Sequence, residues 1–495
     1  CKTGLIDAIR LLYNLGKQQK ELYVTTDDFY IGETVITISY EFKDLTLSQK
    51  GAFYEYLVLG ATEDEDHARI TISYKLENQK VLFNYFTGEI EGQKADTLTF
   101  QYFIHYYLGA LRDSTRDLLL NRSSILGSLI HRQVEANKSQ SNYETIIRTA
   151  NDDLLKLAEV TRSKNSINSN LTSIYKFSVE NQIGLRIDDT KAETIVNIIK
   201  PYLPHDTKTL TGDGFSLKQN SLGFNNLIYI ATVLGDINQQ IKDDTISHFT
   251  LLIEEPEAHL HPQLQLNLFS FLKQANGQEN SQLFITTHSP TLTSKVPLEN
   301  LIHLSKNIGA INIAECFENR EKIKVEEDDE DAFIDDVAGR KKQLERYIDV
   351  TKSQLFFSKG VLFVEGISEE LLVSAFAQIL DQNLEDYKIE LLNADGTSFY
   401  PFIYLFNSTD KEKTLPIPLS ILTDDDRFTA SKNTEYSFIN IKNDLAKAEK
   451  LYEDIYAATE TTRIKNIKAA IKSVPDKIKL NTATKTFEFA IVLAN

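Results

Sequence analysis

The chain changes its pattern of hydrophobic and polar positions several times, and each change predicts a different kind of element. Residues 1–16 place apolar side chains on one face at helical spacing, which predicts an amphipathic helix. From about residue 34 to 99 apolar and polar positions alternate, as in half-buried antiparallel strands. From about 102 to 203 the pattern turns helical, with many charges and few Gly or Pro. We therefore expect an antiparallel sheet followed by a helical arm.

Later in the chain the apolar runs become short and continuous. Phe249–Ile253 and Leu283–Ile285 fit the buried strands of a parallel sheet. A strand at Val361–Val364, an amphipathic helix at Ser368–Leu380 and a strand at Leu419–Leu422 then follow in that order. Such an order of strand, helix and strand is typical of a doubly wound parallel sheet. The fold class predicted for both regions is α/β.

The length of the chain also predicts more than one domain. A chain of 495 residues is too long for a single hydrophobic core. The acidic stretch Val325–Asp336 is interpreted as a solvated linker, because runs of like charge repel and stay hydrated. We expect a first domain at residues 1–310 with the helical insertion at about 102–203, a linker at 311–355 and a second domain at 356–495.

Composition narrows the function classes. The net charge of -18 weighs against a basic coat for nucleic acid, although catalytic carboxylates beside local basic patches are compatible with it. No apolar run is long enough to cross a bilayer, and no secretory signal opens the sequence, so no membrane partner is expected. The two cysteines, Cys1 and Cys316, lie far apart and suit a reducing cytoplasm.

Two motifs of the first domain carry groups that bind phosphate and magnesium. The opening CKTGLIDAIRLL looks like the tail of a phosphate-binding loop, in which Lys2 would reach the phosphates and Thr3 would bind Mg²⁺. A chance Lys-Thr pair before a helix is the alternative for this motif alone. In LLIEEPEAHLHP a buried strand delivers Glu254 and Glu255 at its C-terminal end, where open α/β sheets bind ligands. Glu254 would hold the Mg²⁺ through water, and Glu255 would orient and deprotonate an attacking water.

Two further motifs extend the nucleotide hypothesis. In QLFITTHSP, His288 follows a strand and could sense a γ-phosphate, whereas a lone His is more often structural. In NSLGFNNLIYIATVL, Ser221, Gly223 and Asn226 open a helix whose N-terminus suits an anion. The alternative for this second motif is a capped core helix.

The second domain carries acidic residues at the ends of two predicted strands. Glu365 follows one strand in GVLFVEGISEELL, and Glu369 lies four residues on, in the first turn of the next helix. Asp424 and Asp426 end the other strand in PLSILTDDDRF and face the same side, while Asp425 faces away. Hard oxygen ligands of this kind suit Mg²⁺ or Mn²⁺, and metals held there would activate water against a phosphodiester. Acidic loop ends are common, so either cluster alone is only suggestive.

Together the first four motifs resemble the ABC-type ATPase heads of the SMC, RecF and OLD proteins. The resemblance implies ATP as a ligand and a homodimer that sandwiches ATP, with Ser221 to Asn226 acting as the signature motif that completes the partner's site. Glu254 stands where these heads more usually have Asp. The upstream half of the phosphate loop is expected to precede the first residue of this sequence.

The second domain resembles TOPRIM sequences of the OLD family. The segment LERYIDVTKSQLFFSKGVLFVEGISEELL looks closely similar, Glu365 matches the TOPRIM glutamate, and Asp424 with Asp426 matches its D-x-D. The resemblance implies Glu369 and Glu488 as further metal ligands. Asn393, Gly396 and Ser398 fall where the family has a second strand and loop, with no role assigned. The TOPRIM domain is expected to continue beyond Asn495.

The predicted architecture is thus an ABC/SMC-like ATPase head with an inserted helical arm, followed by a TOPRIM α/β domain. By resemblance to the OLD family of ATP-dependent endonucleases, we expect an ATP-regulated, Mg²⁺- or Mn²⁺-dependent DNA endonuclease or nickase. The resemblance also implies phage defence or DNA processing, a homodimer or higher homo-oligomer, and a helicase-like or reverse-transcriptase system partner.

Two alternatives remain open from the sequence. A topoisomerase would need a nucleophilic Tyr in a separate cleavage domain, and none of the 22 Tyr lies in a stretch that reads as one. An ATP-driven DNA clamp or sensor of the RecF/SMC type would bind DNA without cutting it, and its acidic clusters would be structural.

Overall fold

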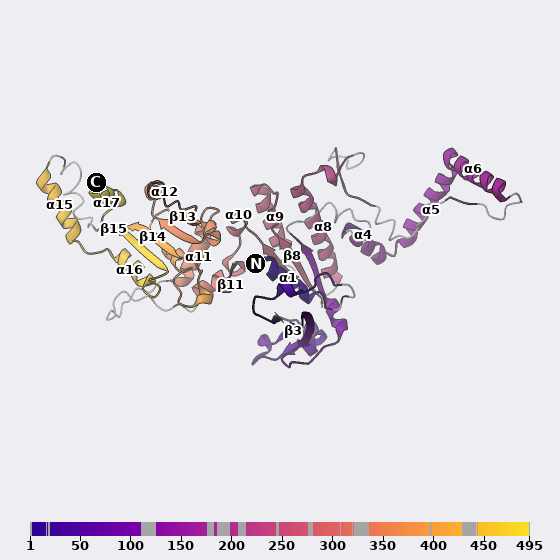
Figure 1. Cartoon of the computed structure of the whole chain (residues 1–495), viewed down its shortest axis with the longest axis horizontal. Helices are drawn as coiled ribbons and strands as arrows, with labels where there is room; N and C mark the ends of the chain where they lie inside the picture. Colours follow the sequence, from indigo (N-terminus) through magenta and orange to yellow (C-terminus); the bar gives the residue numbers. More distant parts are fainter. Residues whose placement is uncertain are drawn as a thin grey trace. The chain divides into compact units, whose positions relative to one another are not determined.

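The computed structural model comprises two compact units (Figure 1). The first unit is Thr3–Thr286, and the second contains Lys2 and the residues from Thr287 onward. Among the residues described, no helix combines the length and apolarity needed to cross a membrane. The structure describes residues 2–15, 17, 20–109, 125–175, 183–185, 199–205, 214–243, 247–275, 281–306, 308–318, 320, 336–396, 398–427, 442 and 444–494.

The first unit opens with a helix and an antiparallel sheet, as the sequence predicts. Helix α1 spans Lys2–Leu12 and buries Ile6, Leu11 and Leu12. The sheet contains β1 (Val35–Phe42), β2 (Leu57–Val58), β3 (His67–Glu77) and β4 (Lys80–Thr87), and β3 pairs antiparallel with each of the other three. The predicted antiparallel strands are confirmed, and the side chains of β1 alternate between exposed and half-buried positions.

A three-stranded parallel sheet forms the second layer of this unit. Its order is β5 (Phe103–Leu108), β8 (His248–Glu254) and β9 (Ser281–Thr286), and β8 pairs in parallel with both neighbours. Helices α8 (Leu222–Asp243) and α9 (Pro262–Ala275) contribute apolar side chains to the same core as β8. The continuous burial of β8 confirms the predicted parallel strand and leaves its C-terminal end at Glu254.

The predicted helical arm is only partly helical. Helices α4 (Ile125–Ala136), α5 (Gln140–Lys156) and α6 (Ala158–Tyr175) lie within the expected range. The expectation of helix from residue 102 is wrong, because β5 is a strand hydrogen-bonded to β8. Its sequence FIHYYL is rich in aromatic and β-branched residues, which favour a strand, and the pairing with β8 overrides the helical pattern that follows.

The second unit is built on a parallel sheet of four strands. The order is β13 (Ile389–Asn393), β12 (Gly360–Val364), β14 (Leu419–Asp424) and β15 (Ile478–Ala483), with every neighbouring pair parallel (Figure 1). Helix α12 (Ile367–Ile379) follows β12. The two strands and the helix predicted here are confirmed. Because the sheet is parallel, the residues that follow β12 and β14 meet at one edge.

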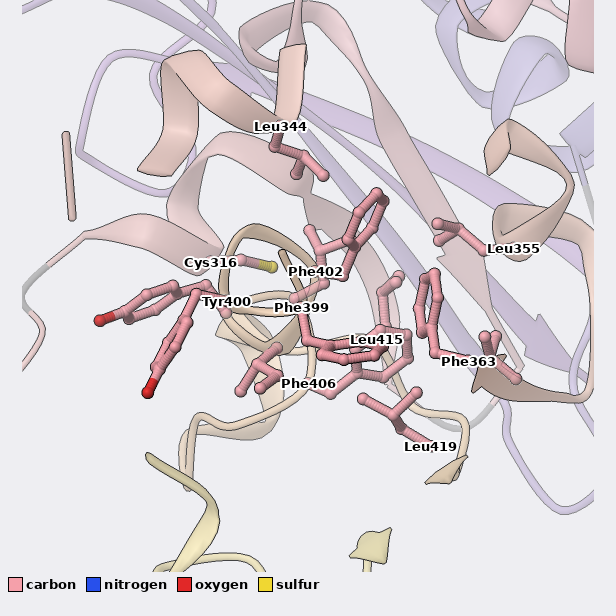
Figure 2. Close-up of a cluster of buried hydrophobic side chains, with 14 of the residues drawn as sticks. Cys316, Leu344, Leu355, Phe363, Phe399, Tyr400, Phe402, Phe406, Leu415 and Leu419 are labelled. Atoms are coloured by element: carbon pink, nitrogen blue, oxygen red, sulfur yellow. The ribbon is translucent and has the colours of Figure 1, made fainter. Parts of the chain in front are cut away.

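The hydrophobic core of the second unit draws on the stretch expected to be a linker. Phe363 on β12 packs with Phe402, and Figure 2 shows this pair in one cluster with Cys316, Leu344 and Leu355. These last three side chains are buried in a way that a hydrated linker would not allow. The division into units accordingly follows Thr286, whereas the sequence analysis expects the first domain to extend to residue 310. The acidic stretch itself lies outside the described residues, except Asp336, which caps the next helix.

The remaining elements are short or peripheral. The other strands form two antiparallel pairs, β6 (Tyr202–Pro204) with β7 (Gly214–Ser216) and β10 (Ile302–Ser305) with β11 (Gly309–Asn312). The other helices are α2 (Leu47–Ala52), α10 (Pro290–Thr293), α11 (Val337–Tyr347), α13 (Tyr400–Ile403), α15 (Leu445–Ala457), α16 (Thr462–Ile471) and α17 (Phe487–Ala494). The 3-10 helices are η1 (Thr26–Asp28), η2 (Tyr54–Tyr56), η3 (Glu63–Glu65), η4 (Thr97–Tyr102), η5 (Leu217–Gln219), η6 (Leu298–Asn300), η7 (Ile313–Phe317), η8 (Lys352–Phe357) and η9 (Lys411–Lys413).

Candidate nucleotide and metal sites

Glu254 and Glu255 lie at the C-terminal edge of the parallel sheet in the first unit. Glu254 ends β8 and is only 5% exposed, and its Oε1 atom has no hydrogen-bond partner among the residues that the structure describes. Buried polar atoms are normally paired, so an orphaned carboxylate oxygen at a ligand-binding edge suits a cation or its bound water. Glu255 follows with a left-handed φ of 44°, and its amide donates to Thr286 O at 2.8 Å. Thr3, in the first turn of α1, is exposed in the same unit.

Tyr107 on β5, the strand beside β8, pairs with Leu252 in the sheet and interacts with Glu254 two residues further along β8. Burial, and then the negative charge of Glu254, raises the pKa of Tyr107, so its hydroxyl stays protonated at neutral pH. The Arg10 guanidinium from α1 lies 3.7 Å from the centroid of the Tyr107 ring. An aromatic hydroxyl and a cation therefore accompany the buried carboxylate. Sequence reasoning missed both, because Tyr107 lies in no motif and Arg10, although it lies in the opening motif, was given no role.

The signature-like segment packs against the loop that follows Glu255. Ser221 Oγ accepts a hydrogen bond from Phe224 N at 3.3 Å, so Ser221 caps α8. This is the alternative of a capped core helix that the sequence analysis left open. A Cβ atom on Gly223 would lie 2.3 Å from the carbonyl oxygen of His259, the residue directly before the L-H-P part of the motif. Asn226 is buried at 4% exposure. Gly223 is thus required for close packing of the helix start on this loop.

Lys2 and His288 share a neighbour in the second unit. Lys2 Nζ donates to the carbonyl of Thr287 and lies 5.6 Å from the centroid of the Phe357 ring. The ring of His288 lies 6.3 Å from the same Phe357 ring. Ser353 Oγ, one turn earlier in η8, donates to Pro290 O at 2.8 Å. The structure brings Lys2 and the His288 segment together and sets both against η8.

The carboxylates of the second unit gather where β12 and β14 end. Glu365 follows β12, and its Oε2 accepts from Thr423 Oγ1 at 2.5 Å and from Asp424 N at 3.1 Å. Asp424 is the last residue of β14, the strand beside β12. The predicted pairing of Glu365 with the start of the D-x-D is therefore present as direct contacts across two strand ends.

The remaining predicted ligands surround Asp424. Burial, and then the charges of Glu365, Glu369, Asp426 and Glu488, raise the pKa of Asp424 to about 7. All five predicted acidic residues therefore act on one strand edge, although they come from three separate stretches of chain. A surplus of negative charge on hard oxygen atoms is the chemistry that Mg²⁺ or Mn²⁺ neutralises.

Hydrogen bonds or ion pairs within the protein involve three of the carboxylates around Asp424, those of Glu369, Asp426 and Glu488. Glu369 is buried, and its Oε2 accepts from Gly366 N at 3.0 Å, which closes the start of α12. Asp426 is 56% exposed and lies 3.7 Å from Lys485 Nζ. Hydrogen bonds from its own amide and from Thr486 and Ser368 lower the pKa of Glu488, so it is ionised.

Within the described part of the chain, no three His, Cys, Asp or Glu side chains are arranged as a ready metal-binding set. One oxygen of Glu365 and one of Glu369 each accept a hydrogen bond from a backbone amide. The donor types and the surplus charge still fit a divalent cation, which would need these side chains to turn toward it. The assignment of Glu365, Glu369, Asp424, Asp426 and Glu488 as ligands stays a prediction.

Two residues near this edge have contacts that the sequence analysis did not predict. Arg463 contacts the ends of both strands, and it has no sequence signal because α16 lies far along the chain from either motif. Asp425 faces away from the other acids, as predicted, but it is fully buried and bound to Thr461 and Arg427. The middle residue of the D-D-D run is thus a structural anchor.

Two of the three residues left without a role contact Glu365 or α12. Gly396 N donates to Glu365 O at 2.9 Å, and Asn393 Nδ2 donates to Glu370 Oε2 at 3.1 Å. The third residue, Ser398, shares a hydrogen bond with Tyr347. A hydrogen bond with Gln343, and then this one with Ser398, lower the pKa of Tyr347. The first two contacts support the backbone around the metal candidates.

Two family profiles match the chain in the order that the motifs suggest. The profile described as "AAA ATPase domain" matches residues 4–293, more than half of the chain, so the chain belongs to this family. The profile described as "Overcoming lysogenization defect protein-like, TOPRIM domain" matches residues 356–426. The chain therefore joins an N-terminal ATPase domain to an OLD-like TOPRIM domain, which confirms the predicted fold class and resemblance.

Two named relatives match long parts of the chain. The chain is 26% identical over 479 residues to "Endonuclease GajA" of Bacillus cereus (strain HuB5-5), covering 86% of this chain and 67% of that protein. It is 23% identical over 325 residues to "OLD nuclease" of Thermus scotoductus (strain ATCC 700910 / SA-01), covering 65% of this chain and 56% of that protein. The chain thus spans only part of the length of each relative.

Solved structures of OLD C-terminal regions also match. The region from Xanthomonas campestris pv. campestris is 28% identical, covering 26% of this chain and 52% of that chain, with a TM-score of 0.16. The region from Burkholderia pseudomallei is 26% identical, covering 28% and 59%, with a TM-score of 0.17. These TM-scores are too low for the superpositions to indicate a shared fold.

Proposed function

We propose that this chain is an ATP-regulated, divalent-metal-dependent endonuclease that cuts or nicks DNA. The observation that carries the proposal is the gathering of Glu365, Glu369, Asp424, Asp426 and Glu488 at one edge of the TOPRIM sheet. The two family profiles and the relatives named as an endonuclease and a nuclease support the same activity.

Mg²⁺ or Mn²⁺ held by these carboxylates would polarise a phosphate oxygen and acidify a water for attack on the phosphodiester. The chain's own residues prepare that site. Thr423 and the Asp424 amide fix the orientation of Glu365, and Arg463 and Lys485 offset the repulsion among the acids. Asp424, with its pKa near neutrality, can hold a proton on its carboxylate when no cation neutralises the cluster.

The ATPase roles follow from the first unit and the Lys2–His288 segment. Lys2 and Thr3 bind the phosphates and Mg²⁺, Glu254 holds the Mg²⁺, and Glu255 activates the attacking water, in our proposal. His288 senses the γ-phosphate. Ser221, Gly223 and Asn226 complete the ATP site of a second copy, so the working form is a homodimer or a higher homo-oligomer. The orphaned buried Oε1 of Glu254 is the structural support for the Mg²⁺ role.

Control by ATP has a physical route through Phe357. This side chain contacts the Lys2 ammonium and the His288 ring, and it lies three residues before Gly360, the first residue of β12. We propose that a change at Lys2 and His288 on ATP binding or hydrolysis moves η8, and with it the strand that leads to Glu365. The hydrogen bond from Ser353 to Pro290 ties η8 to the His288 segment at a second point.

Replacing Phe357 with Ala tests this route. We expect the difference in DNA cleavage with and without ATP to shrink while ATP-free cleavage and ATP hydrolysis persist, because Phe357 is itself neither a predicted metal ligand nor a predicted ATP-binding residue. Phe376→Ala is the matched control, since Phe376 is 38% exposed and Phe357 is 40% exposed in the same unit. An unaltered ATP effect in the Phe357 variant would contradict the proposed route.

The broader roles are proposals of the same kind. DNA is the substrate, phage defence or DNA processing is the setting, and a helicase-like or reverse-transcriptase protein is the system partner. We place the protein in the cytoplasm, in keeping with the free, buried thiol of Cys316.

An ATP-driven DNA clamp without nuclease activity is the second candidate. The observation that favours it is the absence, among described residues, of a ready set of three metal ligands. The variant Asp424→Ala separates the two candidates in a cleavage assay on end-labelled duplex DNA with Mn²⁺. Loss of cleavage with ATP hydrolysis intact supports the nuclease, and cleavage equal to the wild type refutes it.

A further inference from the structure

The side chain of Arg463 joins the two strand ends that carry the predicted metal ligands. Arg463 lies in the first turn of α16. Its Nη1 donates to Thr423 Oγ1 at 3.0 Å and lies 3.4 Å from Glu365 Oε2. Its Nη2 donates to the carbonyl of Asp424 and lies 3.9 Å from Asp426 Oδ2. One nitrogen of the guanidinium therefore lies against Glu365, the residue after β12, and the other binds Asp424, the last residue of β14.

This geometry uses the shape of the guanidinium as well as its charge. The donors of Arg form a planar fork, so two nitrogens can bind two different acceptors at a fixed separation. A Lys ammonium carries the same charge but concentrates its donors at one atom. The Arg463 side chain is 21% exposed, and water therefore competes only in part for its donors.

The position of α16 itself is fixed from the same turn. Thr461, the N-cap residue of α16, donates from its amide at 3.0 Å and from its hydroxyl at 2.9 Å to Asp425 Oδ1. Asp425 N in turn donates to Ala483 O on β15 at 2.8 Å. Asp425, the middle residue of the D-D-D run, thus anchors α16. Arg463 on that helix contacts the two outer residues of the run, Asp424 and Asp426.

Repulsion makes such a support necessary. Glu365 and Asp424 end neighbouring parallel strands, and unneutralised carboxylates in this position drive their side chains apart. We infer that Arg463 is a positioning residue of the TOPRIM metal centre, which holds Glu365 and the Asp424–Asp426 turn at the separation needed to share a divalent cation. This inference rests on the proposed function.

The test is a titration of the full chain with Mn²⁺ in the absence of DNA and ATP. Electron paramagnetic resonance measures how much Mn²⁺ is bound. Arg463→Lys keeps the charge and removes the fork. We expect its Mn²⁺ affinity to fall by about 10- to 100-fold, as is typical when a residue that orients a metal ligand is lost. Arg340→Lys is the matched control, because Arg340 lies over Tyr400 in the same unit and its affinity change should be nil. ATP hydrolysis should stay at the wild-type rate in both variants.

The comparison with a neutral variant separates positioning from charge. If Arg463 only competed with the metal as a cation, Arg463→Gln would bind Mn²⁺ more tightly than the wild type, and this result would overturn the inference. Equal affinity of Arg463→Lys and the wild type would also overturn it. Weaker binding by both variants, with unchanged thermal unfolding, supports it.

The failure of this inference and that of the nuclease assignment remain distinguishable. Glu365→Ala shows which Mn²⁺ signal belongs to this centre. If that signal exists but the wild type cuts no DNA, the nuclease assignment fails while the affinity of Arg463→Lys still decides the positioning role.

Discussion

The change Asp425→Asn tests whether the middle residue of the D-D-D run is an anchor rather than a ligand. The Asp425 side chain is 0% exposed, and its carboxylate accepts from Thr461 and forms an ion pair with Arg427. An Asn of nearly the same shape keeps one oxygen for Thr461. Its amide nitrogen would then face the Arg427 donor, so the buried ion pair would be replaced by two opposed donors.

The size of the effect follows from these contacts. A hydrogen bond between charged groups contributes about 1.5–3 kcal/mol. Arg427 is 21% exposed and keeps Glu460 at 3.4 Å as a second partner, which limits the loss. We therefore expect the free energy of unfolding of the second unit to fall by about 2 kcal/mol, below the range of about 3–5 kcal/mol for breaking a fully buried pair. For a unit of this size that corresponds to a decrease in Tm of about 4–8 °C.

Differential scanning calorimetry measures this change, and the adjacent residue supplies the control. Asp426 is 56% exposed, so Asp426→Asn should leave Tm within about 1–2 °C of the wild type. The same Asp426 variant should lower DNA cleavage, because Asp426 belongs to the predicted D-x-D. The reasoning is refuted if Asp425→Asn unfolds at the wild-type temperature, or if Asp426→Asn is the more destabilised of the two.

Three further predictions concern the first unit. Glu255→Gln should slow phosphate release from ATP by about 100-fold or more, since a general base contributes at least this much, and a wild-type rate would exclude Glu255 as the base. Gly223→Ala should lower the free energy of unfolding by about 1–3 kcal/mol in urea titrations, because its Cβ would lie 2.3 Å from His259 O. Gly235→Ala, on the same helix and with its nearest neighbour at 3.9 Å, should instead be neutral or stabilising by about 0.5–1 kcal/mol, and equal losses in both variants would refute the packing argument. Burial lowers the pKa of His248 from 6.5 to about 4, so the unfolded state binds the extra proton and stability falls as the pH falls from 6.5 toward 4. His248→Gln should flatten that part of the stability curve by up to about 3 kcal/mol, and parallel curves for variant and wild type would contradict it.

The parts of the fold that the sequence predicted are those whose pattern is local. Alternation in β1 and β3 and the continuous apolar run of β8 each define a strand without knowledge of its partner. Strand β5 escaped prediction because its identity comes from pairing with β8, about 145 residues away, and propensity is a weaker guide than such tertiary contacts. The stretch expected to be a linker was misjudged for a related reason, since Leu344 and Leu355 acquire their burial only from the core of the second unit.

In the candidate sites too, the residues that belong to a local motif were predicted, and those placed only by the tertiary fold were not. Glu365 and Asp424 were predicted because each ends a strand with a recognisable pattern, and parallel pairing brings such ends together. Arg463 was not, because nothing in the sequence around it distinguishes a helix-surface Arg from one that reaches two strand ends 39 and 98 residues away. Asp425 was set apart from the predicted ligands by its direction along the strand. Its burial beneath Thr461 was not predicted, because it depends on α16 returning to the strand end.

The central claim is that the gathered carboxylates cut DNA under the control of ATP. The most direct measurement is conversion of supercoiled plasmid to nicked or linear DNA by the full chain with Mg²⁺ or Mn²⁺, with and without ATP, beside Glu365→Ala. We predict metal-dependent cleavage that ATP changes and that the variant loses while it still hydrolyses ATP. Cleavage retained by Glu365→Ala, or none by the wild type under any of these conditions, would contradict the account.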